Sequence, residues 1–120
     1  MLKLGHKNLT TWEKSLELVE SIYKFCDKLP EKEKYIIIPQ LKRAAISVSS
    51  NIAEGYARKS KKETLRFLDI ARSSLVEIDT QIAITVKLKY VDEKNINKLS
   101  ETINHTFALL TKLINSIIQN

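Results

Sequence analysis

The sequence contains few of the residues that interrupt regular structure. Only two glycines and two prolines occur in 120 residues, far below their average frequency in globular proteins. Folds built from many short strands need many turns, and turns draw on glycine and proline. The shortage therefore predicts a few long helices. A single cysteine also excludes an intramolecular disulfide and any zinc cluster built from cysteines.

Long apolar runs are missing as well. No stretch approaches the roughly 20 apolar residues of a membrane-spanning helix, and residues 1–10 lack the apolar segment of a signal peptide. Hydrophobic residues still make up 43% of the chain, which is enough for a folded core. Lysine and arginine outnumber aspartate and glutamate by 20 to 14. We therefore expect a cytoplasmic helical protein, outside the membrane, whose net charge of +6 favours an acidic partner.

No linker or low-complexity segment divides the chain. We expect a single domain over residues 1–120, with a polar tail at residues 1–9. Helices are predicted from about residue 10 to 29, from 39 to 55, from 61 to 89 and from 92 to about 117. Because the connections are short, consecutive helices must run in opposite directions. The predicted fold is all-α: an antiparallel up-down-up-down four-helix bundle.

Residues at the predicted boundaries support these helices. Pro30 ends the first helix, and Pro39 is a favoured first residue for the second. Ser60 and Glu63 have the spacing of a capping box before the third helix. Asp92 is a suitable N-cap for the fourth helix.

Each predicted helix carries an apolar stripe at helical spacing. The first is predicted to bury Trp12, Leu16, Val19, Tyr23 and Cys26. The stripes of the second and third helices are Leu41, Ala44 or Ala45, Val48, Ile52 and Gly55, and Leu65, Leu68, Ala71, Leu75, Ile78 and Ile82. The stripe of the fourth is Ile96, Leu99, Ile103, Thr106, Leu110, Leu113 and Ile117.

The fourth helix is more apolar than one buried face requires. Nine of the 16 residues from 103 to 118 are apolar, whereas a bundle helix needs about three in seven. One interpretation is a broad core seam. The other is a second buried face, and hence a homo-oligomer, because large exposed apolar patches are rare on monomers.

Small polar residues gather in the middle of the second predicted helix. Ser47, Ser49, Ser50 and Asn51 are poor residues for a helix interior. Such residues are tolerated where another helix packs closely, or at a functional site. We favour close packing.

The sequence offers little support for enzymatic chemistry. Neither His6 nor His105 follows a glutamate by three residues, so the Glu-x-x-His pattern of di-iron bundles is missing. Cys26 lies on an apolar stripe and is interpreted as a buried hydrophobe. We predict no catalytic residue, no metal ligand and no cofactor. If the protein were an enzyme, a metal in the bundle core would be sought at Glu54, Glu77 and Asp79.

Basic residues gather where the second predicted helix meets the third. Five positive charges fall within nine residues, at Arg58, Lys59, Lys61, Lys62 and Arg66. Further charge is expected on neighbouring turns, from Lys42, Arg43 and Arg72. The cluster is either an ordinary solvated face or a phosphate-binding patch, to which the free amides at the start of the third helix would contribute. Aromatic residues do not alternate with these basic residues, so the pattern does not suggest stacking on bases. Contacts to nucleic acid would therefore involve its sugar-phosphate backbone, and binding would depend on salt concentration.

Three segments resemble the 23S rRNA-intervening sequence protein family, also called four helix bundle proteins. The most specific is LKRAAISVSSNIAEGYARKS at residues 41–60, and residues 9–15 and 63–77 are also similar. The resemblance spans roughly residues 9–90 and implies a small four-helix bundle. The family also looks like the accessory variability determinant of diversity-generating retroelements, a basic pentamer that binds nucleic acid and a reverse transcriptase.

These observations together lead to one functional hypothesis and one alternative. We expect a non-enzymatic homo-oligomer that binds RNA or DNA as an accessory protein, and the resemblance implies a pentamer. The alternative is an oligomeric scaffold whose basic face binds an acidic protein.

Overall fold

Four long helices make up most of the protein. The computed structural model describes residues 1–120, apart from the side chain of Asn8. The helices are α1 (Thr10–Cys26), α2 (Ile37–Ala57), α3 (Lys61–Lys87) and α4 (Asn97–Gln119). Short 3₁₀ helices lie at Gly5–Asn8, Glu31–Glu33 and Glu93–Ile96. The described part of the chain contains no strand, which confirms the predicted all-α class.

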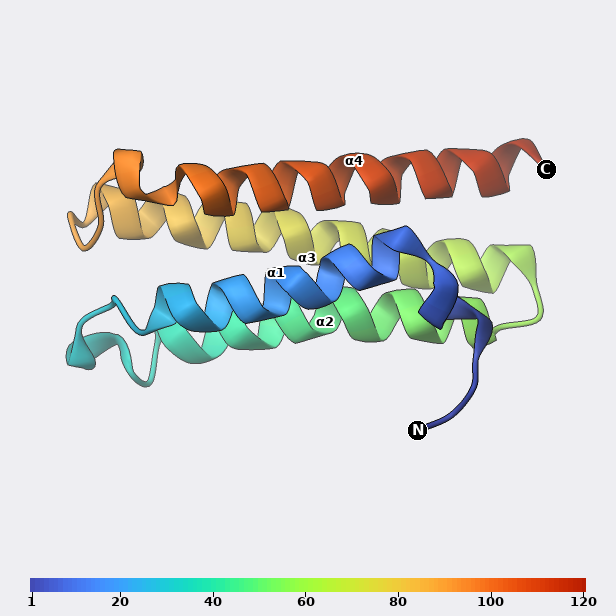
Figure 1. The fold of residues 1–120 in the computed structure, drawn as a ribbon, viewed down its shortest axis with the longest axis horizontal. Helices are drawn as coiled ribbons and strands as arrows, with labels where there is room; N and C mark the ends of the chain where they lie inside the picture. The colour runs from blue at the N-terminus through green and yellow to red at the C-terminus, as the bar shows by residue number, and fades with distance from the viewer.

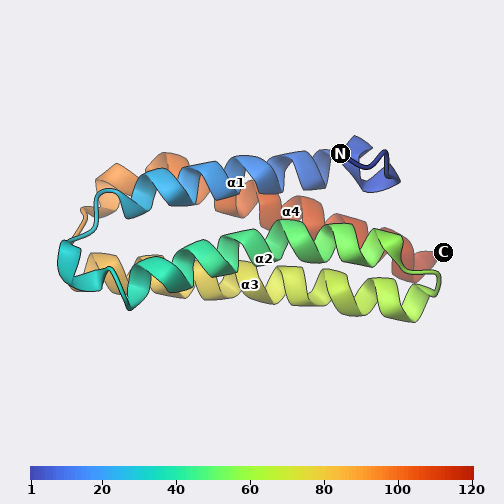
Figure 2. The same cartoon turned by 90° about the horizontal axis from the view of Figure 1, so that it is seen from below.

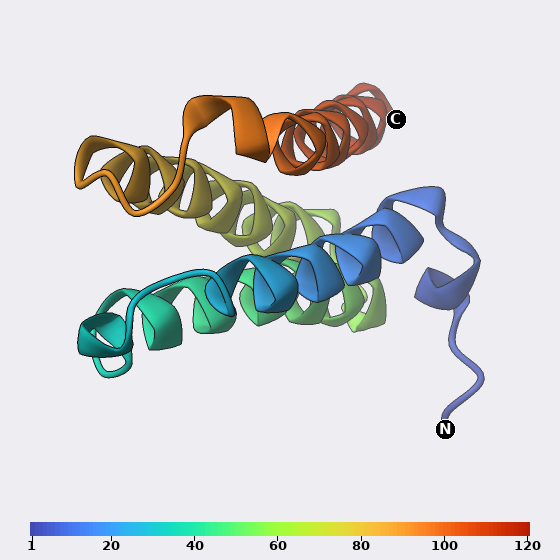
Figure 3. The ribbon, with the colours of Figure 1, turned by 60° about the vertical axis from the view of Figure 1, so that its left-hand side comes forward.

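The chain runs along the long axis of the molecule four times. Consecutive helices point in opposite directions, as the colour gradient shows, and α2 and α3 lie side by side in both views (Figures 1 and 2). The oblique view in Figure 3 shows α1 beside α2 and α4 beyond α3. The bundle measures 45 × 27 × 21 Å. Short connections therefore produce the up-down-up-down order.

Two predicted helix starts are wrong. Helix α2 begins at Ile37, two residues before Pro39. Proline is tolerated there because the first four amides of a helix have no intrahelical acceptor. Helix α4 begins at Asn97, since Glu93–Ile96 forms a 3₁₀ helix. Asp92 precedes that 3₁₀ helix and makes no side-chain capping hydrogen bond.

The two other long helices end earlier than predicted. Helix α1 stops at Cys26, three residues before Leu29. Helix α3 stops at Lys87, because Lys89 adopts a left-handed backbone with φ of 64°. In that conformation Tyr90 N donates to the carbonyl of Thr85, which closes the last turn of the helix.

The predicted buried face of α1 is rotated from the observed one. Leu18 and Ile22 are completely buried, whereas Leu16 is 44% exposed and Tyr23 is 40% exposed. Two apolar rows with almost the same spacing run along α1: the predicted row, which contains Leu16 and Tyr23, and the row that contains Leu18 and Ile22. Only the positions of α2 and α4 decide which row becomes the centre of the core, so periodicity alone chose the wrong one.

The predicted stripe of α3 is confirmed, because every member from Leu68 to Ile82 is buried. On α4, Leu99, Ile103 and Leu110 are buried as predicted, and Ile114 joins them. Leu109, Leu113 and Ile117 are half-buried. Most of the apolar surplus of α4 therefore belongs to a broad core seam. Of the nine apolar residues between positions 103 and 118, three stay exposed: Phe107, Ala108 and Ile118.

Serine hydroxyls join neighbouring helices. Ser49 of α2 is buried and lies 2.9 Å from Ser15 of α1, oxygen to oxygen. On the other side of α2, Ser74 of α3 donates to Ser47 at 3.0 Å. Asn51 also donates to the Ser47 hydroxyl. Small side chains with hydroxyls let the helices approach closely without leaving buried polar groups unpaired, which bears out the packing interpretation.

The N-terminal segment is more ordered than a polar tail. Residues 1–4 are exposed, but His6 is only 6% exposed. Its ring meets that of Trp12 edge-on, with 4.8 Å between the ring centres. The Gly5–Asn8 3₁₀ helix thus folds back against the start of α1, a contact that the prediction for residues 1–9 missed.

Shortening a side chain in the core should lower the free energy of unfolding far more than shortening one on the surface. Leu75 is 1% exposed and its neighbour Val76 is 54% exposed. We expect Leu75→Ala to lower the free energy of unfolding by about 3 kcal/mol, because it removes buried methyl groups and leaves a cavity. The control Val76→Ala should change it by less than about 0.5 kcal/mol. Urea unfolding followed by circular dichroism measures both, and equal losses would contradict the observed burial.

Candidate nucleic-acid interface

The basic residues of the α2–α3 turn are held by a rigid connection. Only residues 58–60 separate the two helices. The Ser60 hydroxyl accepts a hydrogen bond from the Glu63 amide at 3.1 Å, which caps α3. The Thr64 hydroxyl donates to the carbonyl of Gly55 at 2.9 Å, which joins the start of α3 to the end of α2.

The predicted capping box is only half formed. The Ser60 hydroxyl caps α3 as predicted. The Glu63 carboxylate, which in a full capping box would accept from the Ser60 amide, instead accepts a hydrogen bond from Arg66 Nε at 2.8 Å. This hydrogen bond from Arg66 lowers the pKa of the Glu63 carboxyl.

Two arginines flank one aromatic ring at the turn. The guanidinium carbons of Arg58 and Arg66 lie 4.7 Å and 4.5 Å from the centre of the Phe67 ring. Sequence reasoning missed Phe67, although its position directly after Arg66 was a usable signal. The ring is half-buried beneath the two cations, so it orients them and is not free to stack on a base.

Both arginines also pair with carboxylates three or four residues before them, Glu54 of α2 and Glu63 of α3. Arg58 lies 2.9 Å from Glu54, and Arg66 lies 2.8 Å from Glu63. These pairs are exposed and contribute little stability. A phosphate can therefore replace the carboxylate without a large loss, because a guanidinium binds either group with two parallel hydrogen bonds.

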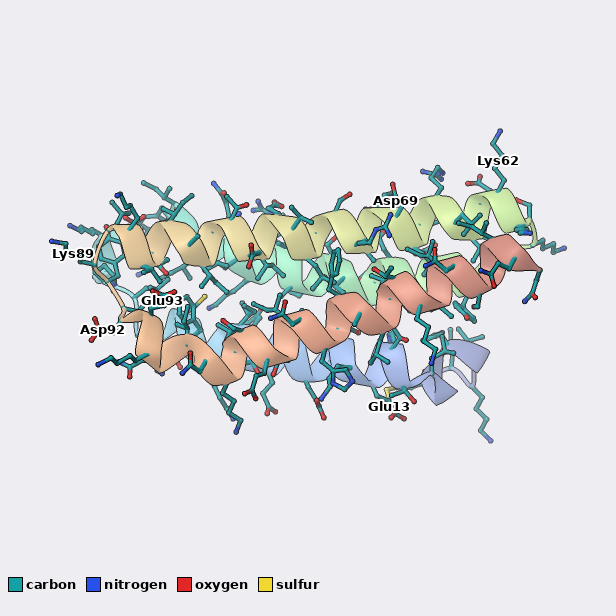
Figure 4. All side chains as sticks on the ribbon, turned by 90° about the horizontal axis from the view of Figure 1, so that it is seen from above. Glu13, Lys62, Asp69, Lys89, Asp92 and Glu93 are labelled. Carbon is teal, nitrogen blue, oxygen red and sulfur yellow. The ribbon has the colours of Figure 1, made fainter. Side chains whose placement is uncertain are left out.

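The lysines of the turn are exposed at the end of the bundle. Lys59, Lys61 and Lys62 form no ion pair with any described side chain. Lys61 Nζ donates to the carbonyl of Ile118 at 3.1 Å, which brings the last turn of α4 to this end. Figure 4 shows Lys62 pointing outward here, while Lys89, Asp92 and Glu93 mark the opposite end.

Three predicted site residues lie away from this cluster. Lys42 and Arg43 lie roughly 20 Å along the axis from the end of α2, at 1.5 Å per residue. Lys42 Nζ sits 4.6 Å from the centre of the Tyr23 ring. Arg72 lies three turns into α3 and pairs with Asp69 at 3.3 Å. The prediction that these residues extend the cluster on neighbouring turns is wrong, because both helices point away from the turn.

The groups considered for catalysis do not form a site. Glu54, Glu77 and Asp79 are exposed, so they are not carboxylates of the bundle core. Among the described residues, no group of three or more histidine, cysteine, aspartate or glutamate side chains could hold a metal ion. His105 is exposed on α4.

None of the described helices is long and apolar enough to cross a membrane.

Comparison with known proteins identifies the family. The model of the 23S rRNA-intervening sequence protein family matches residues 7–112. The chain belongs to this family. None of the curated proteins is a detectable relative.

A solved structure supports the fold of this family member. It is a protein of unknown function from the S23 ribosomal protein family of Bacteroides thetaiotaomicron VPI-5482, with a TM-score of 0.80. The superposition covers 88% of this chain and 98% of that chain, at 21% sequence identity. At this identity the likeness establishes the shared bundle and leaves the role of individual residues open.

Cys26 should be unreactive in the folded protein. Its side chain is 3% exposed, and burial raises the pKa of the thiol to about 11. Since the thiolate is the nucleophile, we expect alkylation by iodoacetamide at pH 8 to be slow in the native state and fast after unfolding in urea. Equal rates in both states would contradict the buried position of Cys26.

Proposed function

We propose that this protein is a non-enzymatic, cytoplasmic accessory protein that binds RNA or DNA as a homo-oligomer. The observation that carries the proposal is the lysine and arginine cluster of the α2–α3 turn, where three exposed lysines lie beside two stacked arginines. Membership in the 23S rRNA-intervening sequence protein family supports it as well.

Backbone amides at the start of α3 support phosphate as the ligand. The amides of Lys61 and Lys62 precede the first backbone hydrogen bond of α3, which runs from Thr64 N to the Ser60 carbonyl. They lie at the positive end of the helix dipole, next to the lysine side chains. The Phe67 ring is covered, so recognition falls on the sugar-phosphate backbone and is independent of base sequence.

Binding should depend on salt and on the α2–α3 turn. We expect the triple variant Lys61/Lys62/Arg66→Glu to bind single-stranded RNA at least about tenfold more weakly at low salt, and to lower the salt slope by about 2. The measurement is fluorescence anisotropy with a labelled oligonucleotide, RNA and DNA in parallel, across a salt series.

A matched control changes the same charge at the other end of the bundle. The variant Lys87/Lys89/Lys94→Glu should bind like the wild type, since these residues lie at or near the α3–α4 connection. Equal losses in the two variants would mean that only net charge matters. Absence of binding by the wild type at low salt would refute the proposal. Complexes that survive nuclease treatment would favour the acidic-protein scaffold.

Oligomerisation is tested separately. We expect light scattering to give a multiple of 13.8 kDa, namely five copies, as the family resemblance implies. A ring of five would repeat the basic turn and multiply a weak attraction for phosphate. A monomer at micromolar concentration would refute the oligomer.

A further inference from the structure

An apolar strip runs along the outer side of α1 and α2. Trp12, Leu16, Val19 and Tyr23 recur along α1 at spacings of four, three and four, the heptad spacing of a helix that packs on another helix. Leu16 is 44% exposed and Tyr23 is 40% exposed. The strip that periodicity assigned to the core therefore faces outward in part.

Helix α2 widens this strip. Lys42 lies over the ring of Tyr23, and Ser49 bonds to Ser15, so the residues between them on this side of α2 face α1. Ile46 lies there and is 45% exposed. Trp12 and Val19 are half-buried against the core, so Leu16, Tyr23 and Ile46 form the exposed part of the strip. Exposed apolar side chains rimmed by charged residues are typical of an interaction site.

Acidic residues border the strip on α1. Glu13, Glu20 and Asp27 recur every seven residues, and each follows an apolar residue of the heptad pattern. All three are exposed. If Leu16 and Tyr23 are placed at position a of a heptad and Trp12 and Val19 at position d, the three acidic residues fall at position e. Charges at this position select the partner helix and its direction. The occupant should therefore be a helix with a basic edge.

Helix α4 of the same chain presents such an edge. Lys98, His105 and Lys112 also recur every seven residues and are exposed. Beside them, a shallow hollow on α4 is lined by Phe107, which is 38% exposed, by smaller side chains from Ala108 to Ser116, and by the longer Lys112 and Gln119. Ile118, 56% exposed, lies one turn beyond Ile114 towards the end of α4. The hollow can receive the larger side chains of the α1–α2 strip.

We infer that the α1–α2 strip of one copy packs antiparallel against α4 of a second copy. This inference rests on the proposed homo-oligomer. In that contact the two rows meet in register: Glu13 lies opposite Lys112 and Asp27 opposite Lys98, with Glu20 and His105 facing each other between these two charge pairs. Within one chain Glu20, Lys98 and His105 line the groove between α1 and α4. No described ion pair joins the two rows, and Glu20 pairs instead with Lys24 of its own helix at 3.5 Å, both side chains being exposed.

The contact uses two different surfaces of the chain. In such a head-to-tail dimer, one copy still has a free α1–α2 strip and the other a free α4 surface. Further copies can therefore add until the two free surfaces meet and a ring closes. Since α1 and α4 already run antiparallel within a copy, all copies in the ring point the same way (Figure 1). Every α2–α3 turn then lies on one rim, where a single nucleic acid can reach several of them.

Two variants, each damaging one surface, test the inference. Leu16→Glu places a charge in the strip, and Phe107→Glu places one beside the hollow. We expect each variant alone to have the mass of one chain, 13.8 kDa, by light scattering. An equimolar mixture should form a dimer, because the intact strip of the Phe107→Glu chain fits the intact α4 of the Leu16→Glu chain.

Matched controls separate association from folding. Ile84→Glu changes a residue of α3 that is 42% exposed, and it should leave the mass of the oligomer unchanged. If an apolar-to-charged variant fails to fold, charge reversal takes its place. Glu13→Lys and Lys112→Glu should each weaken association by about tenfold, and the double variant should restore it. Circular dichroism checks the helix content of every variant.

The outcomes distinguish this inference from the proposed function. An unchanged mass in the folded single variants, a mixture that stays monomeric, or a double reversal that does not restore association would overturn the inference. RNA binding is measured on the same preparations. A wild-type oligomer that behaves as expected but binds no RNA would refute the nucleic-acid role and leave the interface standing.

Discussion

The close approach of α2 to α3 at Gly55 is the contact on which the arrangement of the basic turn depends. A Cβ atom at residue 55 would lie 3.2 Å from the carbonyl oxygen of Thr64 and 3.3 Å from the Cβ of Phe67, closer than most side-chain contacts. Because glycine has no side chain, the two helices meet here, and the Thr64 hydroxyl reaches the Gly55 carbonyl. Helix α2 ends two residues later, so this contact sets where the lysines and arginines of the turn lie.

The same principle governs the middle of the bundle. Ser47 and Ser49 are small enough for α3 and α1 to approach α2 from both sides, and their hydroxyls are paired across the interfaces. Burying a hydroxyl without a partner costs stability, and the pairing of these two serines avoids that cost. Helix α2 is thus in contact with both neighbours along its length, and α4 completes the bundle over α1 and α3 (Figure 4).

Basic charge and exposed apolar side chains occupy different parts of the outer surface. The end of the bundle at the α2–α3 turn is basic, and its ion pairs are exposed and contribute little stability. The sides carry heptad-spaced apolar and charged rows, which suit helix-to-helix contact. Local spacing could identify the basic cluster, since its members are neighbours in sequence. It also places Phe67 directly after Arg66, but the approach of Arg58 to the same ring depends on how α2 and α3 meet.

The sequence by itself determined the four helices, their order and the buried stripe of α3, because periodicity, capping residues and short connections are local properties of the chain. It also determined the capping role of Ser60. Only the tertiary structure decided which of the two apolar rows of α1 is buried. A helix with two apolar rows can bury either one, and the choice depends on the neighbouring helices, whose positions are not encoded within the helix itself.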